Sequence, residues 1–176
     1  MSDMAEEKLP VITYAEDVPQ QDFRPIPWQI RVDGCESGMQ CFYSAHWTYP
    51  RKEDPAKQSA PPAKKVGHPP HLHKENEIMM MIGGDPDDPY DLGATVEFCI
   101  GKDMKKYTFT RSVTIMIPGG VPHGYFKVVE CTRPFMFVQI QEAPVRTEKF
   151  LWEYLTQEEI DSIEHKDHWK DTGFDD

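Results

Sequence analysis

The chain has 176 residues, a length that fits one domain of ordinary size and allows a substantial core. It carries 30 Asp and Glu against 19 Lys and Arg, which gives a net charge of −11. This acidic balance excludes a broad phosphate-binding surface, because such a surface needs clustered positive charge, so nucleic acid is not an expected partner. An acidic beginning without a long apolar run predicts a cytoplasmic protein with no signal or membrane-spanning segment.

The first third of the sequence predicts short strands and one long loop. Prolines and glycines occur throughout the chain and exclude long helices from most of it. Residues 1–27 are expected to form an N-terminal extension with an edge strand. Strands are expected at 28–32 and 39–49, where aromatic and β-branched residues dominate. The segment from 50 to 70 predicts a surface loop, either an exposed connection or a flap over a pocket.

Six further short strands are expected in the middle of the chain. They are 77–82, 95–100, 106–110, 113–118, 123–129 and 135–141. Many short strands separated by turns are typical of an all-β sandwich or barrel, which we place at residues 28–145. The acidic segment Asp85–Pro89 is expected to be a solvated turn, because its prolines and spacing do not fit a calcium-binding loop.

The C-terminal part, residues 146–176, predicts a short helical segment and a tail. Thr156 and Glu159 have the spacing of a capping box, and Ile160 and Ile163 follow at a helical spacing. The apolar and aromatic residues just before this helix are expected to pack it against the barrel or against a second subunit.

Four cysteines lack the Cys-x-x-Cys spacing of zinc ribbons and redox motifs. We expect them to be reduced, since a chain of this length does not need disulfide bonds for stability. Cys99 is expected in the barrel core. A bridge between Cys35 and Cys41 across a hairpin stays an open alternative.

The residues that indicate chemistry begin with His71 and His73. In an extended chain these side chains point the same way, about 6.6 Å apart along the strand. Four more residues of straight strand would carry Glu77 about 13 Å further, too far to share one ion. The chain must therefore turn at residues 74–76, and we expect this turn to place Glu77 on the neighbouring antiparallel strand.

A fourth candidate ligand, His123, follows a Pro-Gly-Gly-Val-Pro turn and is expected to face inward. Three imidazoles and one carboxylate suit one divalent first-row metal: iron, manganese, nickel, cobalt, copper or zinc. Four protein ligands in an octahedral site leave two positions open, as Lewis-acid or oxygen chemistry requires.

Several other residues compete for roles near this site. Glu75 is the rival carboxylate by strand parity, but we favour Glu77 because residue 75 is expected at the tip of the turn. Tyr125 shares strand parity with His123 and is the candidate catalytic group for proton transfer. Weaker candidates for supporting hydrogen bonds are His46, His68, Tyr43 and Gln139.

The two segments His71-x-His73-x-x-x-Glu77-x-x-x-x-x-x-Gly84 and Pro118-x-Gly120-x-x-His123 resemble the two motifs of the cupin superfamily. The resemblance implies a jelly-roll β-barrel in which the two histidines, the glutamate and the last histidine hold one metal. The sequence departs from the family pattern at three positions that are not metal ligands: Lys65, Ser112 and Lys127.

Together these features predict a single-domain, metal-dependent cupin enzyme. Its substrate is expected to be a small organic molecule that chelates the metal through oxygen atoms. Two reaction types stay open, an oxygen-dependent reaction and a redox-neutral lyase or isomerase reaction. The alternative is a non-enzymatic cupin that binds a small ligand or a metal as a sensor or storage protein. A homodimer is expected from exposed strand edges, the aromatic C-terminal segment and the resemblance.

Overall fold

The structure, a computed structural model, describes residues 14–18, 30–32, 34, 38–50, 68–163 and 166–174. The expected loop at 50–70 and the expected extension at 1–27 lie mostly outside these residues, and so does Cys35. Cys41, Cys99 and Cys131 are free thiols, as expected. Within the described part of the chain, no helix combines the length and apolarity needed to cross a bilayer.

Most of the described chain is β-structure. The strands are β1 (Ile30–Val32), β2 (Phe42–Thr48), β3 (His71–Leu72), β4 (Glu77–Gly83), β5 (Asp91–Ile100), β6 (Lys105–Arg111), β7 (Val113–Ile117), β8 (His123–Cys131), β9 (Phe135–Gln141) and β10 (Lys149–Phe150). Each strand that the sequence predicts between residues 28 and 141 is present, with ends shifted by a few residues. The edge strand expected within residues 1–27 lies outside the described residues. The short strand β3 contains His71, which the sequence placed in an extended segment. The short strand β10 is additional, and it is too short for a pattern of alternating residues to reveal it.

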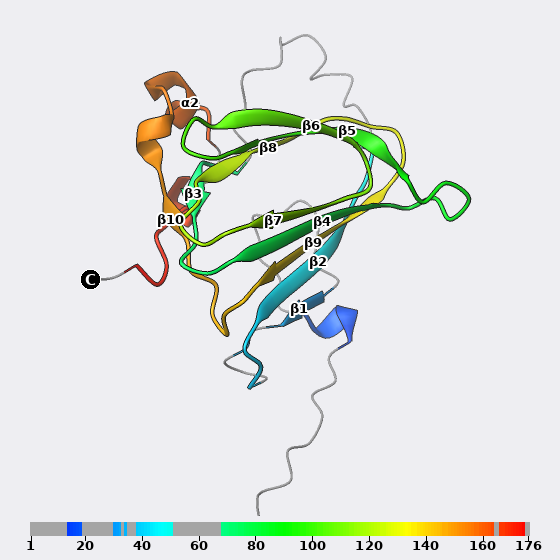
Figure 1. Cartoon of the computed structure of the whole chain (residues 1–176), viewed down its shortest axis with the longest axis horizontal. Coiled ribbons are helices and arrows are strands. Elements are labelled where there is room, and N and C mark those ends of the chain that lie inside the picture. Colours follow the sequence, from blue (N-terminus) through cyan, green and yellow to red (C-terminus); the bar gives the residue numbers. More distant parts are fainter. Residues whose placement is uncertain are drawn as a thin grey trace, which may run out of the picture.

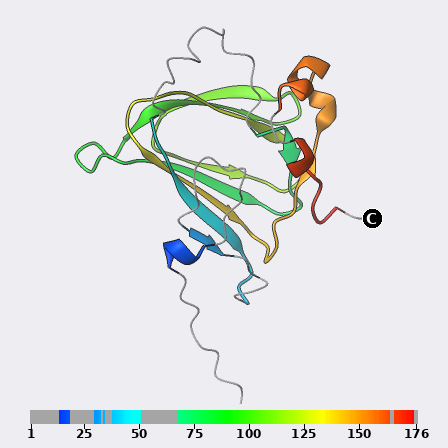
Figure 2. The same cartoon turned by 180° about the vertical axis from the view of Figure 1, so that it is seen from behind.

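The strands form two antiparallel sheets of five strands that face each other (Figure 1). The first sheet has the order β1-β2-β9-β4-β7, and the second has the order β10-β3-β8-β5-β6. The view from behind shows the same two layers, with the C-terminal segment at one end of the barrel (Figure 2). The all-β jelly-roll prediction is therefore confirmed.

The core lies between the two sheets. In β4, burial alternates along the strand, so Met79 and Met81 face inward while Met80 is only partly buried. Near the barrel end that holds β3, Met79 packs with Phe98 and Ile117. Further along, Met81 packs with a second group made of Leu92, Ala94, Val96 and Phe135. Each fully buried side chain of this size contributes about 1.5–3 kcal/mol of hydrophobic stabilisation.

The C-terminal segment closes one end of the barrel. It contains the 3₁₀ turn η3 (Trp152–Tyr154), the helix α2 (Gln157–Asp161) and the 3₁₀ turn η4 (Lys166–His168); a further turn, η1 (Ala15–Asp17), lies near the N-terminus. Thr156 and Glu159 form the predicted capping box. Leu155 and Ile163 are buried against Tyr125 of β8, so the segment packs on the barrel of its own chain.

Candidate metal centre

Four side chains from three strands and one turn converge between the two sheets. They are His71, His73, Glu77 and His123, and we call them the inner cluster. Each offers one donor atom, and all four donor atoms lie within 4.8 Å of one another. Their exposed fractions are between 1% and 4%, so the polar atoms are withdrawn from bulk water. The sequence predicted that these residues would meet.

The route by which Glu77 reaches the histidines differs from the prediction. β3 does not pair with β4; the antiparallel partner of His71 is His123 in the second sheet. Glu77 begins β4 in the first sheet, where it is paired with Ile117 and Gln141. Residues 74–76 therefore carry the chain from one sheet to the other, and Glu77 approaches the histidines across the barrel interior. The expectation of a hairpin was wrong because a turn of this length also allows a change of sheet.

The turn before His123 is held against the turn after His73. The backbone N–H of Gly120 donates to the carbonyl of His73 (2.8 Å), and that of Gly119 donates to Oδ1 of Asn76 (3.0 Å). A Cβ atom on Gly119 would stand 2.2 Å from the carbonyl oxygen of Lys74, so only glycine allows this approach. The glycine-bearing turn thus brings the two halves of the inner cluster together.

Backbone carbonyls fix the orientation of all three imidazoles. Nδ1 of His71 donates to the carbonyl of Pro69 (2.8 Å), and Nδ1 of His123 donates to that of Val121 (2.9 Å). Nδ1 of His73 donates to the carbonyl of Thr147. A carbonyl can only accept, so each ring carries its proton on Nδ1 and keeps a lone pair on Nε2. This is the arrangement of histidines that bind metals through Nε2.

The inner atoms of the cluster lack partners within the described residues. Nε2 of His73, Nε2 of His123 and Oε2 of Glu77 are buried without a hydrogen bond. Oε2 of Glu77 lies 3.0 Å from Nε2 of His123 and 3.6 Å from Nε2 of His73, so acceptor atoms face one another. Buried, unpaired acceptors cost free energy, and a bound cation removes this cost for all of them. The residues therefore fit a divalent metal.

The charge environment keeps these groups in the protonation states that a metal needs. Burial lowers the pKa of His71 well below its usual value, and the neighbouring imidazoles of His123 and His68 lower it further. Burial raises the pKa of Glu77, but a proton on Nε2 of His123 or of His73, in the position that a metal would take, lowers it by more, so its pKa lies well below the usual range. A neutral imidazole and an ionised carboxylate are the ligand forms.

The rival carboxylate, Glu75, lies outside the inner cluster. It accepts a hydrogen bond from the hydroxyl of Thr147 (2.6 Å) and is half-buried at the turn. Gln139, one of the weaker candidates, has a clear role instead, because its amide donates to Oε1 of Glu77. Oε1 of the glutamate is thereby occupied and Oε2 stays directed at the histidines.

Tyr125 does not face the inner cluster, which corrects the prediction that it shares the cavity of His123. Its hydroxyl donates to the carbonyl of Tyr154 (2.9 Å), and its ring packs on the C-terminal segment. Tyr125 has a φ of 52°, and the pairing of β8 with β5 changes register between Gly124 and Lys127. This bulge breaks the simple alternation on which the parity argument depends. Burial raises the pKa of Tyr125 to about 12.

Three further side chains, His68, Arg146 and Glu148, form an outer cluster that touches the inner one. Oε1 of Glu148 lies 3.3 Å from Nε2 of His68 and 3.7 Å from Nε2 of His71. The guanidinium of Arg146 pairs with the same carboxylate. Burial lowers the pKa of His68 to about 4, so it is neutral at neutral pH. The sequence predicted His68 but gave no signal for Glu148, which lies in an irregular segment beyond the motifs.

The other weak candidates lie elsewhere in the first sheet. The ring of His46 packs against Phe137 at a centroid distance of 5.3 Å. Tyr43 is paired with Ile140 in the β2–β9 ladder. We therefore assign neither His46 nor Tyr43 a role in the inner cluster.

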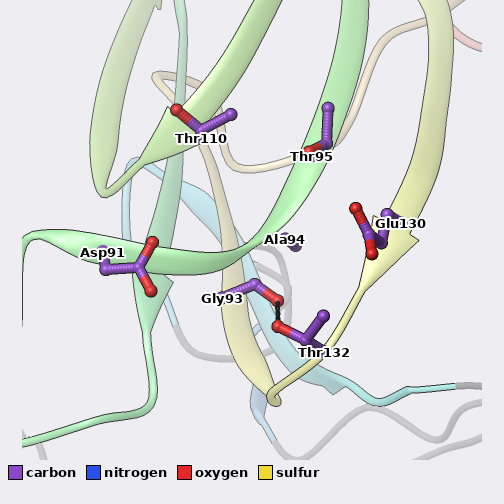
Figure 3. Close-up of a pocket in the computed structure, with 7 residues that line it drawn as sticks. All are labelled: Asp91, Gly93, Ala94, Thr95, Thr110, Glu130 and Thr132. Atoms are coloured by element: carbon purple, nitrogen blue, oxygen red, sulfur yellow. Dashed lines mark hydrogen bonds between the residues drawn. The ribbon is translucent and has the colours of Figure 1, made fainter.

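Two surface hollows of similar size lie at different places. One, of about 170 Å³, is lined partly by Asn76, Glu77 and Glu142 and adjoins the inner cluster from outside. The other, of about 160 Å³, is lined by residues of β5, β6 and β8 and of the segment after β8, including Asp91, Thr110 and Thr132 (Figure 3). It contains none of the candidate site residues. Both are smaller than the roughly 300–1,000 Å³ typical of small-ligand pockets.

Comparison with known proteins relates the chain to solved structures only. No family model and no curated protein matches the sequence. The structure is similar to oxalate decarboxylase from Lactobacillus farciminis in a formate complex, with 11% identity, a TM-score of 0.50, and coverage of 79% of this chain and 35% of that chain. A single-residue variant of oxalate decarboxylase from Bacillus subtilis gives 11% identity, a TM-score of 0.50, and coverage of 87% of this chain and 36% of that chain.

The polyketide cyclase RemF from Streptomyces resistomycificus gives 14% identity, a TM-score of 0.49, and coverage of 89% of this chain and 100% of that chain. This chain thus spans about a third of the length of the oxalate decarboxylases that it resembles. At such low identities the likeness concerns the fold. The two facing antiparallel sheets and the oxalate decarboxylase neighbours show that the chain has the cupin-type jelly-roll fold.

Proposed function

We propose that this protein is a metal-dependent cupin enzyme that acts on a small organic molecule bound to a divalent metal through oxygen atoms. One observation carries the proposal: buried acceptor atoms of His73, Glu77 and His123 converge without hydrogen-bond partners among the described residues. The fold of the oxalate decarboxylases supports a small oxygen-rich acid as the substrate class.

Each residue of the site has a part in this proposal. His71, His73, Glu77 and His123 hold the ion, and the carbonyls of Pro69, Thr147 and Val121 orient the three rings. A bound divalent ion would polarise a substrate oxygen or activate oxygen or water. The apolar side chains of Phe98 and Met79 exclude water from the same end of the barrel. Gln139 holds the carboxylate of Glu77 in place.

Metal analysis of the native, untagged protein tests the proposal. We expect about one first-row divalent ion per chain, with iron, manganese, nickel and zinc as the leading candidates. His123→Ala should lose stoichiometric metal and keep the β-sheet circular dichroism spectrum. Glu75→Gln is the matched control and should keep the metal, because Glu75 lies outside the inner cluster. Retention of the metal in His123→Ala would contradict the proposal.

The proposal leaves two reaction types, and a separate measurement distinguishes them. Oxygen uptake by the iron-loaded protein in the presence of small hydroxy and oxo acids would indicate an oxygenase. Conversion of the same acids without oxygen consumption would indicate a redox-neutral lyase or isomerase. No turnover in either assay would contradict an enzymatic role for this panel of compounds.

A second candidate is a non-enzymatic cupin that binds a small ligand or stores a metal. The dense apolar packing of Met79, Phe98 and Ile117 beside the inner cluster favours it, because that packing limits the room for a large substrate. Stable binding of a small acid without its conversion over many hours would support this candidate.

The proposal includes a homodimer in the cytoplasm. The outer strands of the two sheets are β1 and β7 in the first and β10 and β6 in the second, and such strands offer unpaired backbone groups for association. The aromatic C-terminal segment packs on its own barrel and supports dimerisation less than expected. Light scattering that gives twice the mass of the 20.4 kDa chain would support the dimer.

A further inference from the structure

We infer that Gln141 is the residue that recognises the organic ligand at the inner cluster, and that this ligand is a small 2-hydroxycarboxylate monoanion. The inference rests on the proposed function, since it assumes a metal at the inner cluster. It adds the substrate class and the residue that selects it.

The position of Gln141 follows from the register of the first sheet. It ends β9 directly opposite Glu77 of β4, and its other neighbour is Phe42 of β2. Residues paired across a sheet project from the same face, so the side chain of Gln141 stands beside the carboxylate of Glu77 on the inner face. Its exposed fraction is 0%.

The amide of Gln141 has no hydrogen-bond partner among the described residues. Both Nε2 and Oε1 are buried and unpaired. Gln139, two residues earlier on the same face, has its amide paired with Glu77. One of these two similar side chains therefore completes the metal ligand, while the other has donor and acceptor capacity left over. Buried amides are nearly always paired in folded proteins, so an unpaired one beside a metal site indicates a missing ligand.

The chemistry of the amide defines what would pair with it. A primary amide presents a donor and an acceptor side by side, so its complement presents an acceptor and a donor in the same order. A 2-hydroxycarboxylate has this order: a carboxylate oxygen accepts from Nε2, and the neighbouring hydroxyl donates to Oε1. The carboxylate and hydroxyl oxygens also fit the two coordination positions that four protein ligands leave open on an octahedral ion.

The buried charges favour a monoanion. A divalent ion with three neutral imidazoles and the carboxylate of Glu77 has a net charge of about +1 by formal counting. In the outer cluster the guanidinium of Arg146 pairs with the carboxylate of Glu148, so these two charges compensate each other. A ligand with one negative charge brings the whole buried site to neutrality, whereas a neutral ligand or a dianion leaves an uncompensated charge.

Titration calorimetry on the metal-loaded protein tests both parts of the inference, with glycolate, acetate and oxalate as the probes. Acetate lacks the hydroxyl donor, and oxalate is a dianion without a donor. We expect glycolate to bind the wild type at least about tenfold more tightly than either, since an amide left unpaired rejects the analogues. Gln141→Met keeps the unbranched shape and should weaken glycolate at least about tenfold. It should weaken acetate by less, because acetate loses only the hydrogen bond from Nε2. Ile140→Val, on the neighbouring residue of the same strand, is the apolar control and should bind glycolate like the wild type.

Thermal unfolding of the metal-free proteins gives a second measurement that needs no ligand. If the amide of Gln141 is unpaired in the fold, Gln141→Met should raise Tm by about 2–4 °C, because the buried polar group is removed. A lower Tm would overturn the inference, since it would show that the amide is satisfied within the protein.

The metal content, measured first, separates the possible failures. A wild type without metal would overturn both the proposed function and this inference. A metal-loaded wild type that binds glycolate no better than acetate or oxalate would overturn the inference alone. The same holds if Gln141→Met keeps full glycolate affinity. The wild-type comparison remains decisive if the variant does not fold.

Discussion

The inner cluster is fully buried and the adjacent outer cluster is partly buried, and they differ in whether the charge of their carboxylate is compensated within the protein. In the outer cluster, the carboxylate of Glu148 is paired with Arg146 and lies near His68, so its charge is compensated within the protein. In the inner cluster, Glu77 faces the unprotonated nitrogens of His73 and His123, and acceptors meet acceptors. The two clusters are in contact: Nδ1 of His68 lies 3.1 Å from Nδ1 of His71, and Oε1 of Glu148 lies 3.7 Å from Nε2 of His71.

This difference between the two clusters shows that residue type alone does not define a metal site. Both clusters contain histidine and glutamate. A second group of donor atoms close enough to surround an ion consists of His68 and Glu148 together with His71, which belongs to the inner cluster. The guanidinium of Arg146 already occupies the carboxylate of the outer cluster, and a second cation there would meet its positive charge. The inner cluster has no such cation among the described residues, and its rings are oriented by backbone carbonyls. We therefore propose the inner cluster, and not the outer one, as the metal site.

The strongest test of this comparison exchanges one carboxylate in each cluster. Glu77→Gln removes a charged ligand and should lower metal affinity by more than the roughly 10–100-fold loss typical of a residue that only supports a ligand. Glu148→Gln should keep the metal and lower the free energy of unfolding by about 1–3 kcal/mol, since Arg146 loses its partner. Competition with a chelator measures the affinity and urea unfolding measures the stability.

The reverse result would break the comparison. Loss of metal in Glu148→Gln with retention in Glu77→Gln would move the site to the outer cluster. Circular dichroism of both variants controls for loss of the fold.

A second test uses the pH dependence of stability in the metal-free protein. The unfolded chain binds a proton at His68 near pH 6.5, while the folded chain keeps this ring neutral down to about pH 4. Falling pH therefore favours the unfolded state across this window, and the low pKa of His71 acts in the same direction. Because His68 keeps 26% of its side-chain area exposed, we expect a loss on the order of 2 kcal/mol from this residue.

Urea unfolding at several pH values across that window measures the effect. His68→Asn should make the pH profile flatter, because the group that titrates is removed. A profile of His68→Asn identical to that of the wild type would show that the ring is not held neutral by the fold.

A third test examines how the inner cluster is supported. Gln139→Leu removes the amide that donates to Oε1 of Glu77 and should lower metal affinity about 10–100-fold without changing the stoichiometry. Ile140→Val, on the neighbouring residue of the same strand, is the matched control and should bind metal like the wild type. Equal affinities of Gln139→Leu and the wild type would mean that the amide does not position the carboxylate.

The sequence was sufficient for the fold because two signals agreed along most of the chain. Turn residues separate short strands whose composition favours β-structure, and the spacing of Thr156 and Glu159 defines the start of α2. β10 was missed because two residues carry no periodicity. The order of the strands could not be predicted from local sequence patterns either. β9 lies between β2 and β4, and these pairings join segments that are distant in the sequence.

For the site, the sequence predicted the set of residues better than their arrangement. The spacing of His71, His73 and Glu77 required a turn, but it could not tell a hairpin from a crossing between sheets. Glu148 and Gln141 carry no motif, and their importance arises from neighbours that only the folded chain supplies. Polar residues within apolar strands were the one available signal, and that signal did identify Gln139.

The smallest expected effect concerns Tyr125, which the sequence placed at the site and the structure places on the C-terminal segment. Tyr125→Phe removes the hydrogen bond to the carbonyl of Tyr154 and keeps the ring packed near Leu155. It should lower the free energy of unfolding by about 1 kcal/mol, because one partly buried hydrogen bond is lost. Metal affinity and glycolate affinity should equal those of the wild type, since the hydroxyl points away from the inner cluster. A change in either affinity with unaltered stability would return Tyr125 to the site, and it would mean that β8 can turn this side chain inward despite the bulge between Gly124 and Lys127.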